Sequence, residues 1–258
     1  MKILINNQWS TEHDAKISLF NDGFMFGYGI FETLRTYSGR KTLYLEQHID
    51  RLLSGCNRLN LAIEFSATDI QTMVNRVIEA SPHEVQRLKI LVVPGHLIII
   101  STRLMLPDTV LAGYRLKTVV RQRSVPEVKS IAYLDCFLAY QEARLVGYDD
   151  ALLLNNENYV LEASRSNIVW RKDDHWQSCR KNVLPGVTLQ VIDSIISPVR
   201  HGMIDSKDLL KCQEVFICNS ILGVMPVIAV DNMAVNNGLP GEQTLQLKNM
   251  LHRYIREL

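Results

Sequence analysis

The alternation of apolar and polar residues predicts that the first half of the chain combines short strands with helices. Residues 2–6 and 29–37 are rich in apolar and β-branched side chains and predict strands. Residues 45–61 carry apolar side chains three and four positions apart, which is the spacing of an amphipathic helix. A second helix is expected after Ser66 and Asp69, because both side chains can cap a first turn. Three extended runs follow, at residues 87–93, 97–102 and 114–120.

A polar stretch separates this half of the chain from the rest. Residues 121–127 read RQRSVPE, and their charges and proline interrupt the pattern of strands and helices. We interpret this stretch as a linker between two lobes. The sequence then predicts a smaller N-terminal α/β domain at residues 1–120 and a larger C-terminal domain at residues 128–258.

The second half predicts a further mixture of helices and strands. A helix over residues 134–145 should end at Gly147, since glycine readily takes the left-handed conformation found at helix ends. Residues 150–154 and 159–163 predict two strands joined by a turn at residues 155–158. Further elements are expected as a helix at 188–196, strands at 214–218 and 224–230, and a helix at 243–258. The pattern therefore predicts a two-lobed protein of the α/β or α+β class.

The composition is that of an average soluble globular protein, with 47% hydrophobic and 21% charged residues. Lys and Arg number 28 and Asp and Glu 27, and this balance argues against a surface for nucleic acid or membranes. The most apolar stretch, residues 88–100, contains Pro94 and Gly95 and is too short to cross a membrane. The first residues lack the apolar run of a signal peptide. We expect a cytoplasmic protein with a small-molecule substrate.

Several familiar chemical motifs do not fit the chain. The five cysteines are scattered without a C-x-x-C pair, which predicts free buried thiols and no zinc site. The seven histidines lack ligand spacing, so no metal is predicted. The run GYGIFE at residues 27–32 begins like a dinucleotide loop, but Glu32 takes the place of the third glycine.

Six segments, taken in order, carry a family signal. They are NDGFMFGYGIFETLRTY at 21–37, LEQHIDRLLSGCNRLNL at 45–61, VKSIAYL at 128–134, GYDDALLLNNENYVLEASRSNIVW at 147–170, LPGVT at 184–188 and EVFICNSILGVMPV at 214–227. Together they resemble the fold-type IV pyridoxal 5'-phosphate (PLP) enzymes, which include branched-chain and D-amino-acid aminotransferases and aminodeoxychorismate lyase. The resemblance implies a fold like that of D-amino-acid aminotransferase, bound PLP, and a homodimer with active sites at or near the subunit interface.

The resemblance implies a chemical role for three residues around the cofactor ring. Lys129 would form the Schiff base with PLP, a role that needs an amine of lowered pKa. Glu162 would face the pyridine nitrogen and keep it protonated, so that the ring can take up electrons. Tyr133 falls where branched-chain aminotransferases place a tyrosine near the phenolic oxygen. From the residues alone, Lys129 is more readily a solvated lysine at the end of the linker. Glu162 can equally be a solvent-facing acid on a hairpin strand, and Tyr133 a core tyrosine.

The resemblance also implies a phosphate site. Arg51 matches the family's phosphate-binding arginine and would make a two-armed contact to phosphate, although by default its polar helix stripe is a solvated face. Gly186, Val187 and Thr188 open a predicted helix, whose N–H groups and dipole suit an anion. The hydroxyl groups of Thr188 and Ser220 would add donors, as the corresponding family residues do.

The sequence from Cys218 to Ser220 and residues 224–227 resemble aminodeoxychorismate lyase more than the aminotransferases. That enzyme removes pyruvate from 4-amino-4-deoxychorismate and leaves 4-aminobenzoate for folate synthesis. The alternatives are an aminotransferase acting on D- or branched-chain amino acids, and a non-catalytic binding protein that kept the fold. Two departures bear on the substrate: residues 93–96 lack the arginine of the D-amino-acid enzymes, and Ala132 replaces the asparagine usual in the lyases.

Overall fold

The computed structural model describes residues 2–106, 112–195 and 198–257. The chain forms two compact units. Unit 1 contains the residues up to 105 together with residues 128–133, and unit 2 contains residues 106–127 and 134–257.

The expected domains, 1–120 and 128–258, divide the chain at other places than these units do. The strand at residues 114–120 pairs within the sheet of unit 2, and residues 121–127 belong to the same unit. Residues 128–133 belong to unit 1, because they form hydrogen bonds with a strand of that unit. Unit 1 is therefore assembled from two separate stretches of sequence.

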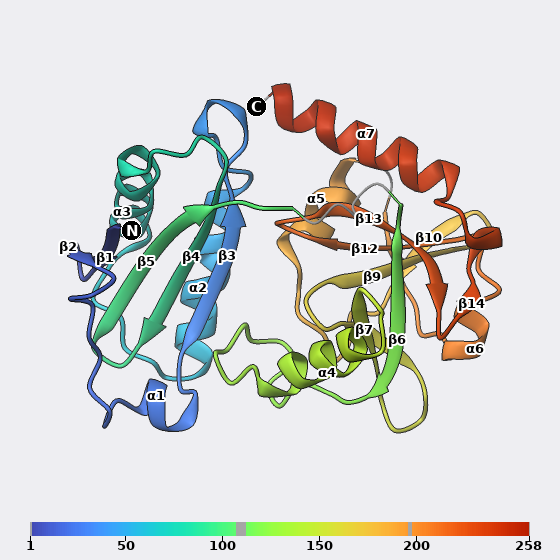
Figure 1. Ribbon diagram of the computed structural model, residues 1–258, viewed down its shortest axis with the longest axis horizontal. Helices are drawn as coiled ribbons and strands as arrows, with labels where there is room; N and C mark the ends of the chain where they lie inside the picture. Colours follow the sequence, from blue (N-terminus) through green and yellow to red (C-terminus); the bar gives the residue numbers. More distant parts are fainter. Residues whose placement is uncertain (1, 107–111, 196–197, 258) are drawn as a thin grey trace. The chain divides into compact units, whose positions relative to one another are not determined.

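Unit 1 is built on a five-stranded antiparallel sheet (Figure 1). The strand order is β2–β1–β5–β4–β3, with β1 at Lys2–Ile5, β2 at Gln8–Thr11, β3 at Ile30–Arg35, β4 at Gln86–Val93 and β5 at His96–Arg103. The helices are α1 at Asp22–Phe26, α2 at Leu45–Arg58 and α3 at Ala67–Ala80, with a short 3-10 helix at Ser38–Arg40. α2 packs on β3, and α3 packs on β1 and β5.

The two faces of β3 differ in burial, as strand geometry requires. Ile30, Glu32 and Leu34 are buried, whereas the residues between them are half-buried. α2 covers the buried face with apolar side chains three and four residues apart, namely Leu45, Ile49, Leu52 and Cys56. Gly55 allows the helix to approach closely, since a Cβ added there would lie 3.3 Å from Cδ1 of Ile30.

Unit 2 contains a nine-stranded mixed sheet (Figure 1). Its order is β11–β10–β9–β12–β13–β6–β7–β8, and β14 pairs with β13 beside this path. The strands are β6 at Tyr114–Val120, β7 at Asp150–Leu154, β8 at Val160–Ala163, β9 at Asn167–Lys172, β10 at His175–Ser178, β11 at Arg200–His201, β12 at Glu214–Asn219, β13 at Gly223–Val230 and β14 at Met233–Ala234. The helices are α4 at Leu134–Leu145, α5 at Val187–Ile195, α6 at Ser206–Leu209 and α7 at Glu242–Glu257.

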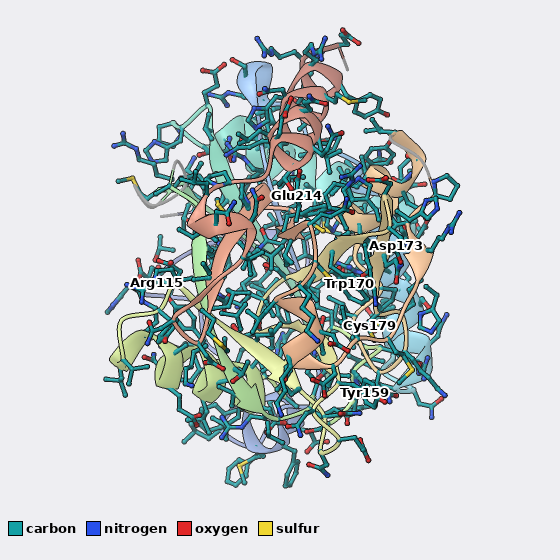
Figure 2. The ribbon with its side chains drawn as sticks, turned by 90° about the vertical axis from the view of Figure 1, so that its right-hand side faces the viewer. Arg115, Tyr159, Trp170, Asp173, Cys179 and Glu214 are labelled. Atoms are coloured by element: carbon teal, nitrogen blue, oxygen red, sulfur yellow. The ribbon has the colours of Figure 1, made fainter. Side chains whose placement is uncertain are left out.

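The core of unit 2 contains both large apolar side chains and a buried acid. Trp170 of β9 and Phe216 of β12 are fully buried. Glu214 is buried at the start of β12, and its carboxylate accepts hydrogen bonds from the backbone N–H groups of Gln243, at 2.9 Å, and Thr244, at 2.7 Å. Trp170 and Glu214 are labelled in Figure 2. The acid therefore caps the N-terminus of α7 from within the core.

The predicted mixture of strands and helices is confirmed, and most elements begin and end within two residues of the expected positions. The helices expected at 188–196 and 243–258 are α5 and α7, and their final expected residues lie outside the described part of the chain. β2 was not predicted, because Gln8–Thr11 has no apolar alternation. It forms because Asn6 and Asn7, with φ of 46° and 65°, make a tight turn that returns the chain along β1.

All five cysteines are free and buried, as expected. None of the helices in the described part of the chain is long and apolar enough to cross a membrane. Within the same residues, no group of three or more His, Cys, Asp or Glu side chains could hold a metal ion.

Candidate active site

Lys129 lies on a segment that runs beside β3 in unit 1. The carbonyl of Lys129 accepts a hydrogen bond from the N–H of Phe31, at 2.9 Å, and the N–H of Ile131 donates to the carbonyl of Gly29, at 2.9 Å. Gly29 has no room for a side chain, since an added Cβ would lie 2.6 Å from the carbonyl oxygen of Val92 and 2.8 Å from Cδ1 of Ile131. Lys129 is half-buried, and its ammonium group lies 4.7 Å from the centre of the Phe31 ring. Its backbone and its ammonium are therefore both placed by β3.

The ring of Phe31 also contacts a second lysine and a tyrosine. The ammonium of Lys89, on β4, lies 5.1 Å from the ring centre. Burial and the charge of Arg87 lower the pKa of Lys89, and Lys89 forms no ion pair with any carboxylate of the described residues. Tyr133 packs edge-on against Phe31, with the ring centres 5.6 Å apart. Two cations therefore lie against one aromatic ring, and the sequence reasoning missed Lys89.

Glu32, Arg51 and His48 form a buried cluster on the other face of β3. Nε of Arg51 donates to Oε1 of Glu32 at 2.7 Å, and Nη2 donates to Oε2 at 2.8 Å. Nδ1 of His48 lies 2.8 Å from Oε2. Burial alone would raise the pKa of Glu32, but the charge of Arg51 and the hydrogen bonds from His48 and Arg51 outweigh it and lower the pKa to about 2. Glu32 is therefore ionised at neutral pH and neutralises Arg51.

The charge of Lys129 also reaches this cluster. Burial lowers the pKa of His48, and the positive charges of Arg51 and Lys129 lower it further, against the attraction of Glu32. His48 is only 3% exposed, and the lowering of its pKa by burial favours the neutral imidazole.

Arg51 is not on a solvated face, because its side chain is only 14% exposed. The Nε–Nη2 edge of the guanidinium binds Glu32, so this edge is not available for the expected two-armed contact to a phosphate. In the sequence, Glu32 stands out only as a misfit in a dinucleotide motif. The signal for its pairing was an acid placed between apolar residues of a predicted strand.

Glu162 lies on β8 in unit 2 and is 4% exposed, so it is not a solvent-facing hairpin residue. Nη1 of Arg123 lies 3.6 Å from Oε1 of Glu162, and the Arg123 side chain is itself 9% exposed. The N–H of Leu184 donates to both carboxylate oxygens, at 3.4 and 3.3 Å. Arg123 came from the stretch interpreted as a linker, and its pairing was not predicted.

The N-terminus of α5 follows the same loop. Asn167, at the start of β9, donates from its side chain to the carbonyl of Leu184, at 2.8 Å. A Cβ added to Gly186 would lie 1.8 Å from Oδ1 of Asn167, so only glycine fits there. Val187 and Thr188 are buried in the first turn of α5. The first N–H groups of a helix have no partner within that helix, so this turn offers donors to an anion.

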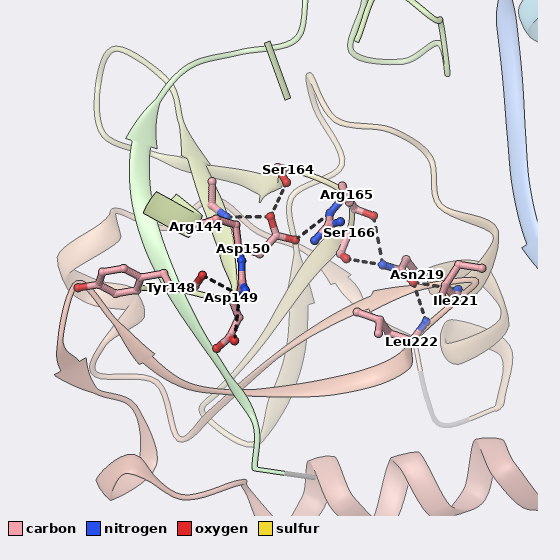
Figure 3. Close-up of polar contacts among 11 residues, drawn as sticks. Arg144, Tyr148, Asp149, Asp150, Ser164, Arg165, Ser166, Asn219, Ile221 and Leu222 are labelled. Atoms are coloured by element: carbon pink, nitrogen blue, oxygen red, sulfur yellow. Dashed lines mark hydrogen bonds and ion pairs between the residues drawn. The ribbon is translucent and has the colours of Figure 1, made fainter. Parts of the chain in front are cut away.

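Ser220 lies in the turn between β12 and β13 and is half-buried. Oδ1 of Asn219 accepts hydrogen bonds from the N–H groups of Ile221, at 2.9 Å, and Leu222, at 2.8 Å (Figure 3). The turn that carries Ser220 is therefore closed by the side chain that precedes it. No role was predicted for Asn219 from the sequence.

Curated relatives match the chain over nearly its full length. It is 28% identical to a putative branched-chain-amino-acid aminotransferase of Methanocaldococcus jannaschii, over 96% of this chain and 94% of that protein. It is 27% identical to the D-alanine aminotransferase of Listeria monocytogenes, covering 100% of this chain and 96% of the relative. It is also 27% identical to the aminodeoxychorismate lyase of Bacillus subtilis, over 97% and 96% of the two chains.

A solved structure shares the fold of this chain, and a family model matches its sequence. The branched-chain aminotransferase of the archaeon Thermoproteus uzoniensis, solved with norvaline, matches with a TM-score of 0.91 at 22% identity, covering 99% of this chain and 94% of that one. This likeness confirms the expected fold-type IV architecture. Residues 29–230 match the profile of the family described as amino-transferase class IV. Because this match spans most of the chain, the protein belongs to the amino-transferase class IV family.

Proposed function

We propose that this chain is a PLP-dependent lyase that converts 4-amino-4-deoxychorismate to 4-aminobenzoate and pyruvate. The observation that carries the proposal is the surroundings of Lys129. The ammonium groups of Lys129 and Lys89 both lie against the ring of Phe31. Lys89 is half-buried and has no ion-pair partner among the described residues. One lysine suits the covalent attachment of a cofactor, and the other suits a carboxylate of the substrate.

The residues of unit 2 fit the ring and the phosphate of PLP. A protonated pyridine nitrogen needs a carboxylate sheltered from water, and Glu162 is 4% exposed. A phosphate needs several donors. The helix start at Gly186, Val187 and Thr188 and the hydroxyl of Ser220 are of this kind. We assign the pyridine nitrogen to Glu162 and the phosphate to these four residues.

The residues of unit 1 have three further roles in the proposal. Lys129 is the amine that attaches the cofactor. Arg51 supplies positive charge to the phosphate, and because Glu32 occupies its Nε–Nη2 edge, this contribution is charge and not a second two-armed contact. Tyr133 lies against Phe31 and is assigned to the phenolic oxygen, as in the branched-chain enzymes.

These residues account for the chemistry as follows. PLP, when bound, withdraws electrons from the carbon that carries the substrate amino group. Once the substrate amine has replaced that of Lys129 on the cofactor, the freed Lys129 amine would take the proton from that carbon, while Glu162 would keep the pyridine nitrogen protonated. The electron pair of the broken C–H bond then expels the ether oxygen, so the C–O bond breaks and pyruvate leaves as its enolate. Solvent protonates the enolate, and Lys129 would release the remaining aromatic ring as 4-aminobenzoate by taking its place on the cofactor again.

The charge beside Phe31 favours this substrate over a branched-chain amino acid. 4-Amino-4-deoxychorismate carries two carboxylates, one on the ring and one on the enolpyruvyl ether. A branched aliphatic side chain would place apolar groups against Lys89 and leave its charge uncompensated, at a cost in desolvation. A second carboxylate compensates it.

An aminotransferase acting on D- or branched-chain amino acids is the second candidate. It is favoured by the relatives from M. jannaschii and L. monocytogenes, which are named as aminotransferases. In that reaction Lys129 would move the proton that it takes from the amino acid, and bound PLP would carry the amino group to a second keto acid while the donor leaves as its own keto acid.

A product assay separates the two candidates. The purified protein is incubated with PLP and 4-amino-4-deoxychorismate, and pyruvate and 4-aminobenzoate are measured. In parallel it is given D-alanine or L-leucine with 2-oxoglutarate, and glutamate is measured. Pyruvate and 4-aminobenzoate in equal amounts support the lyase. Glutamate formation without pyruvate release supports the aminotransferase, and no product in any mixture rules out both.

We also infer that the protein forms a homodimer through an apolar patch of unit 1. The patch consists of Leu19, Phe20, Phe24, Met25 and Phe26, each more than half exposed. None of the residues of α1 is buried, so its large apolar side chains remain exposed on unit 1. Exposed apolar patches of this kind mark interfaces. Sedimentation should give a dimer that Phe20→Asp weakens, and an active wild-type monomer would contradict the inference.

A further inference from the structure

A tight turn of three residues follows Glu162 in unit 2. Ser164, Arg165 and Ser166 join β8 to β9, and the N–H of Ala163 donates to the carbonyl of Ser166 at 2.8 Å. Because only the short end of β8 separates this turn from Glu162, a shift of the turn would move the acid as well.

Asp150 holds one side of this turn (Figure 3). It is 1% exposed, and its Oδ1 accepts hydrogen bonds from the hydroxyl of Ser164 and from the N–H of Ala151, the latter at 2.8 Å. Its Oδ2 lies 3.7 Å from Nε of Arg165. The guanidinium of Arg165 in turn stacks 3.7 Å above the ring of Tyr140. The first two residues of the turn are therefore bound to the core.

Asn219 holds the other side. Its Nδ2 donates to the hydroxyl of Ser166 at 2.8 Å and to the carbonyl of Arg165 at 3.3 Å. Its Oδ1 accepts from the N–H groups of Ile221 and Leu222 (Figure 3). One side-chain amide therefore joins the turn after Glu162 to the turn that contains Ser220.

The same turn is connected to the start of α5. Asn167 follows Ser166 directly, and its side chain binds the carbonyl of Leu184, two residues before Gly186. The three segments that carry the unit 2 residues proposed for the cofactor are thus linked through neighbouring residues. Within this network Asn219 is the residue that reaches the Ser220 turn.

We propose that Asn219 is a positioning residue, whose side-chain amide sets the Ser220 turn relative to the turn that follows Glu162. The inference rests on the proposed function, in which the Ser220 hydroxyl binds phosphate. Asn219 precedes Ser220 and its side chain binds the two N–H groups that follow, so the backbone on both sides of the hydroxyl is restrained. A hydroxyl donor must meet its acceptor within a narrow range of distance and angle, so a free turn loses part of this contact.

The test is a double-mutant cycle on PLP affinity. Cofactor-free protein is titrated with PLP, and binding is followed by absorbance, for wild type, Asn219→Ala, Ser166→Ala and the double variant. Each single change is expected to weaken binding by roughly threefold to tenfold, the range for one hydrogen bond. The double variant should bind no more weakly than Asn219→Ala alone, because both changes remove the same contact.

Asn155→Ala is the matched control. Oδ1 of Asn155 also accepts two backbone hydrogen bonds in a turn of unit 2, from Glu157 at 3.1 Å and Tyr159 at 2.8 Å. The two asparagine variants are expected to lose similar thermal stability, and only Asn219→Ala should lose PLP affinity. Equal PLP affinity in these two variants would overturn the inference, because the effect of Asn219 would then be one of stability alone.

Other outcomes are also decisive. Unchanged affinity in Ser166→Ala, or additive losses in the double variant, would overturn the role of Asn219. If Asn219→Ala does not fold, Ser166→Ala alone decides. A wild-type protein that does not bind PLP would refute the proposed function itself. Weaker binding in Ser220→Ala, with none in Asn219→Ala, would leave that function standing and remove only the positioning role.

Discussion

Arg51 of α2 and Glu32 of β3 are joined inside unit 1 by two hydrogen bonds, Nε to Oε1 at 2.7 Å and Nη2 to Oε2 at 2.8 Å. Removing one member of a buried pair leaves the other charge buried and uncompensated. Loss of PLP binding in Arg51→Ala would therefore not by itself identify a phosphate contact. The stability of the fold must be measured alongside it.

The first prediction concerns this pair. Glu32→Gln keeps the shape of the side chain but leaves Arg51 without its counter-charge, so the free energy of unfolding should fall by about 3–5 kcal/mol. Urea denaturation measures this loss. Glu46→Gln, an exposed acid in the first turn of the same helix, should change it by less than about 0.5 kcal/mol. Equal stability of the two variants would contradict the prediction.

The second prediction is the pH dependence of the same contribution. The pKa of Glu32 is lowered from 4.5 to about 2 in the folded protein. A carboxyl group whose pKa is lower in the folded protein contributes its full stabilisation at pH values above its pKa in the unfolded chain. This stabilisation is lost as the pH falls towards the pKa in the folded protein. The difference in unfolding free energy between wild type and Glu32→Gln should therefore be constant at neutral pH and shrink below about pH 4.5. A difference that grew on acidification would have the wrong sign.

The third prediction identifies the lysine that attaches the cofactor. Borohydride reduction of the protein with PLP, followed by peptide mapping, should place the pyridoxyl group on Lys129. Lys89 provides the internal comparison, because its amine faces the same Phe31 ring. A label on Lys89, or on any other lysine, would remove the assignment.

The fourth prediction tests the role of Glu162. Glu162→Gln also removes the negative charge beside Arg123, so its stability must be measured first. Under conditions where it is folded it should bind PLP, but the neutral amide cannot stabilise a protonated pyridine nitrogen. Turnover should fall on the order of a hundredfold or more, the typical loss for one such electrostatic group. A deuterium isotope effect at the carbon that loses its proton should grow, and Glu157→Gln, on the exposed turn of the hairpin, should be neutral. Near-wild-type turnover in Glu162→Gln would end this assignment.

The fifth prediction concerns Lys89 and substrate choice. Lys89→Met keeps the apolar stem and removes the charge, so KM for a substrate with two carboxylates should rise by roughly tenfold to a hundredfold, as for a hydrogen bond to a charged group. PLP affinity should not change. Lys41→Met, an exposed surface change, is the control. An unchanged KM in Lys89→Met would favour the aminotransferase candidate.

Local patterns predicted most of the elements, because burial of one face leaves a period of two or of three to four in the sequence. α2 is an example, since its apolar residues fall at those spacings and cover the sheet. Contacts between side chains of different elements leave no repeating pattern in the sequence. Glu32 and Arg51 are 19 residues apart, and Asn219 and Ser166 are 53 apart. Only the register of strands and the packing of a helix bring such partners together.

The sequence indicated which residues are candidates for the site, but not which side chains they contact. The resemblance pointed to Arg51, but not to the acid that occupies one edge of its guanidinium. It pointed to Glu162 without Arg123, which lies in a polar stretch whose composition suggests only a linker. Nothing in the sequence indicated Lys89, because a lysine on a predicted strand is normally taken to face solvent. Its contact with the ring of Phe31 becomes known only from the structure.

The discontinuity of unit 1 has a consequence for synthesis of the chain on the ribosome. Residues 128–133 complete this unit, but β6 of the other unit is translated before them. Until residue 131 has left the exit tunnel, the edge of β3 in the emerging N-terminal sheet therefore has no partner from this segment. Pairing then requires a loop to close across the intervening residues. A fragment ending at residue 105 would retain Arg51 and Lys89 and never acquire Lys129. The amine of Lys129 is thus added to this sheet late, by a segment that is made only when about half of the chain has been translated.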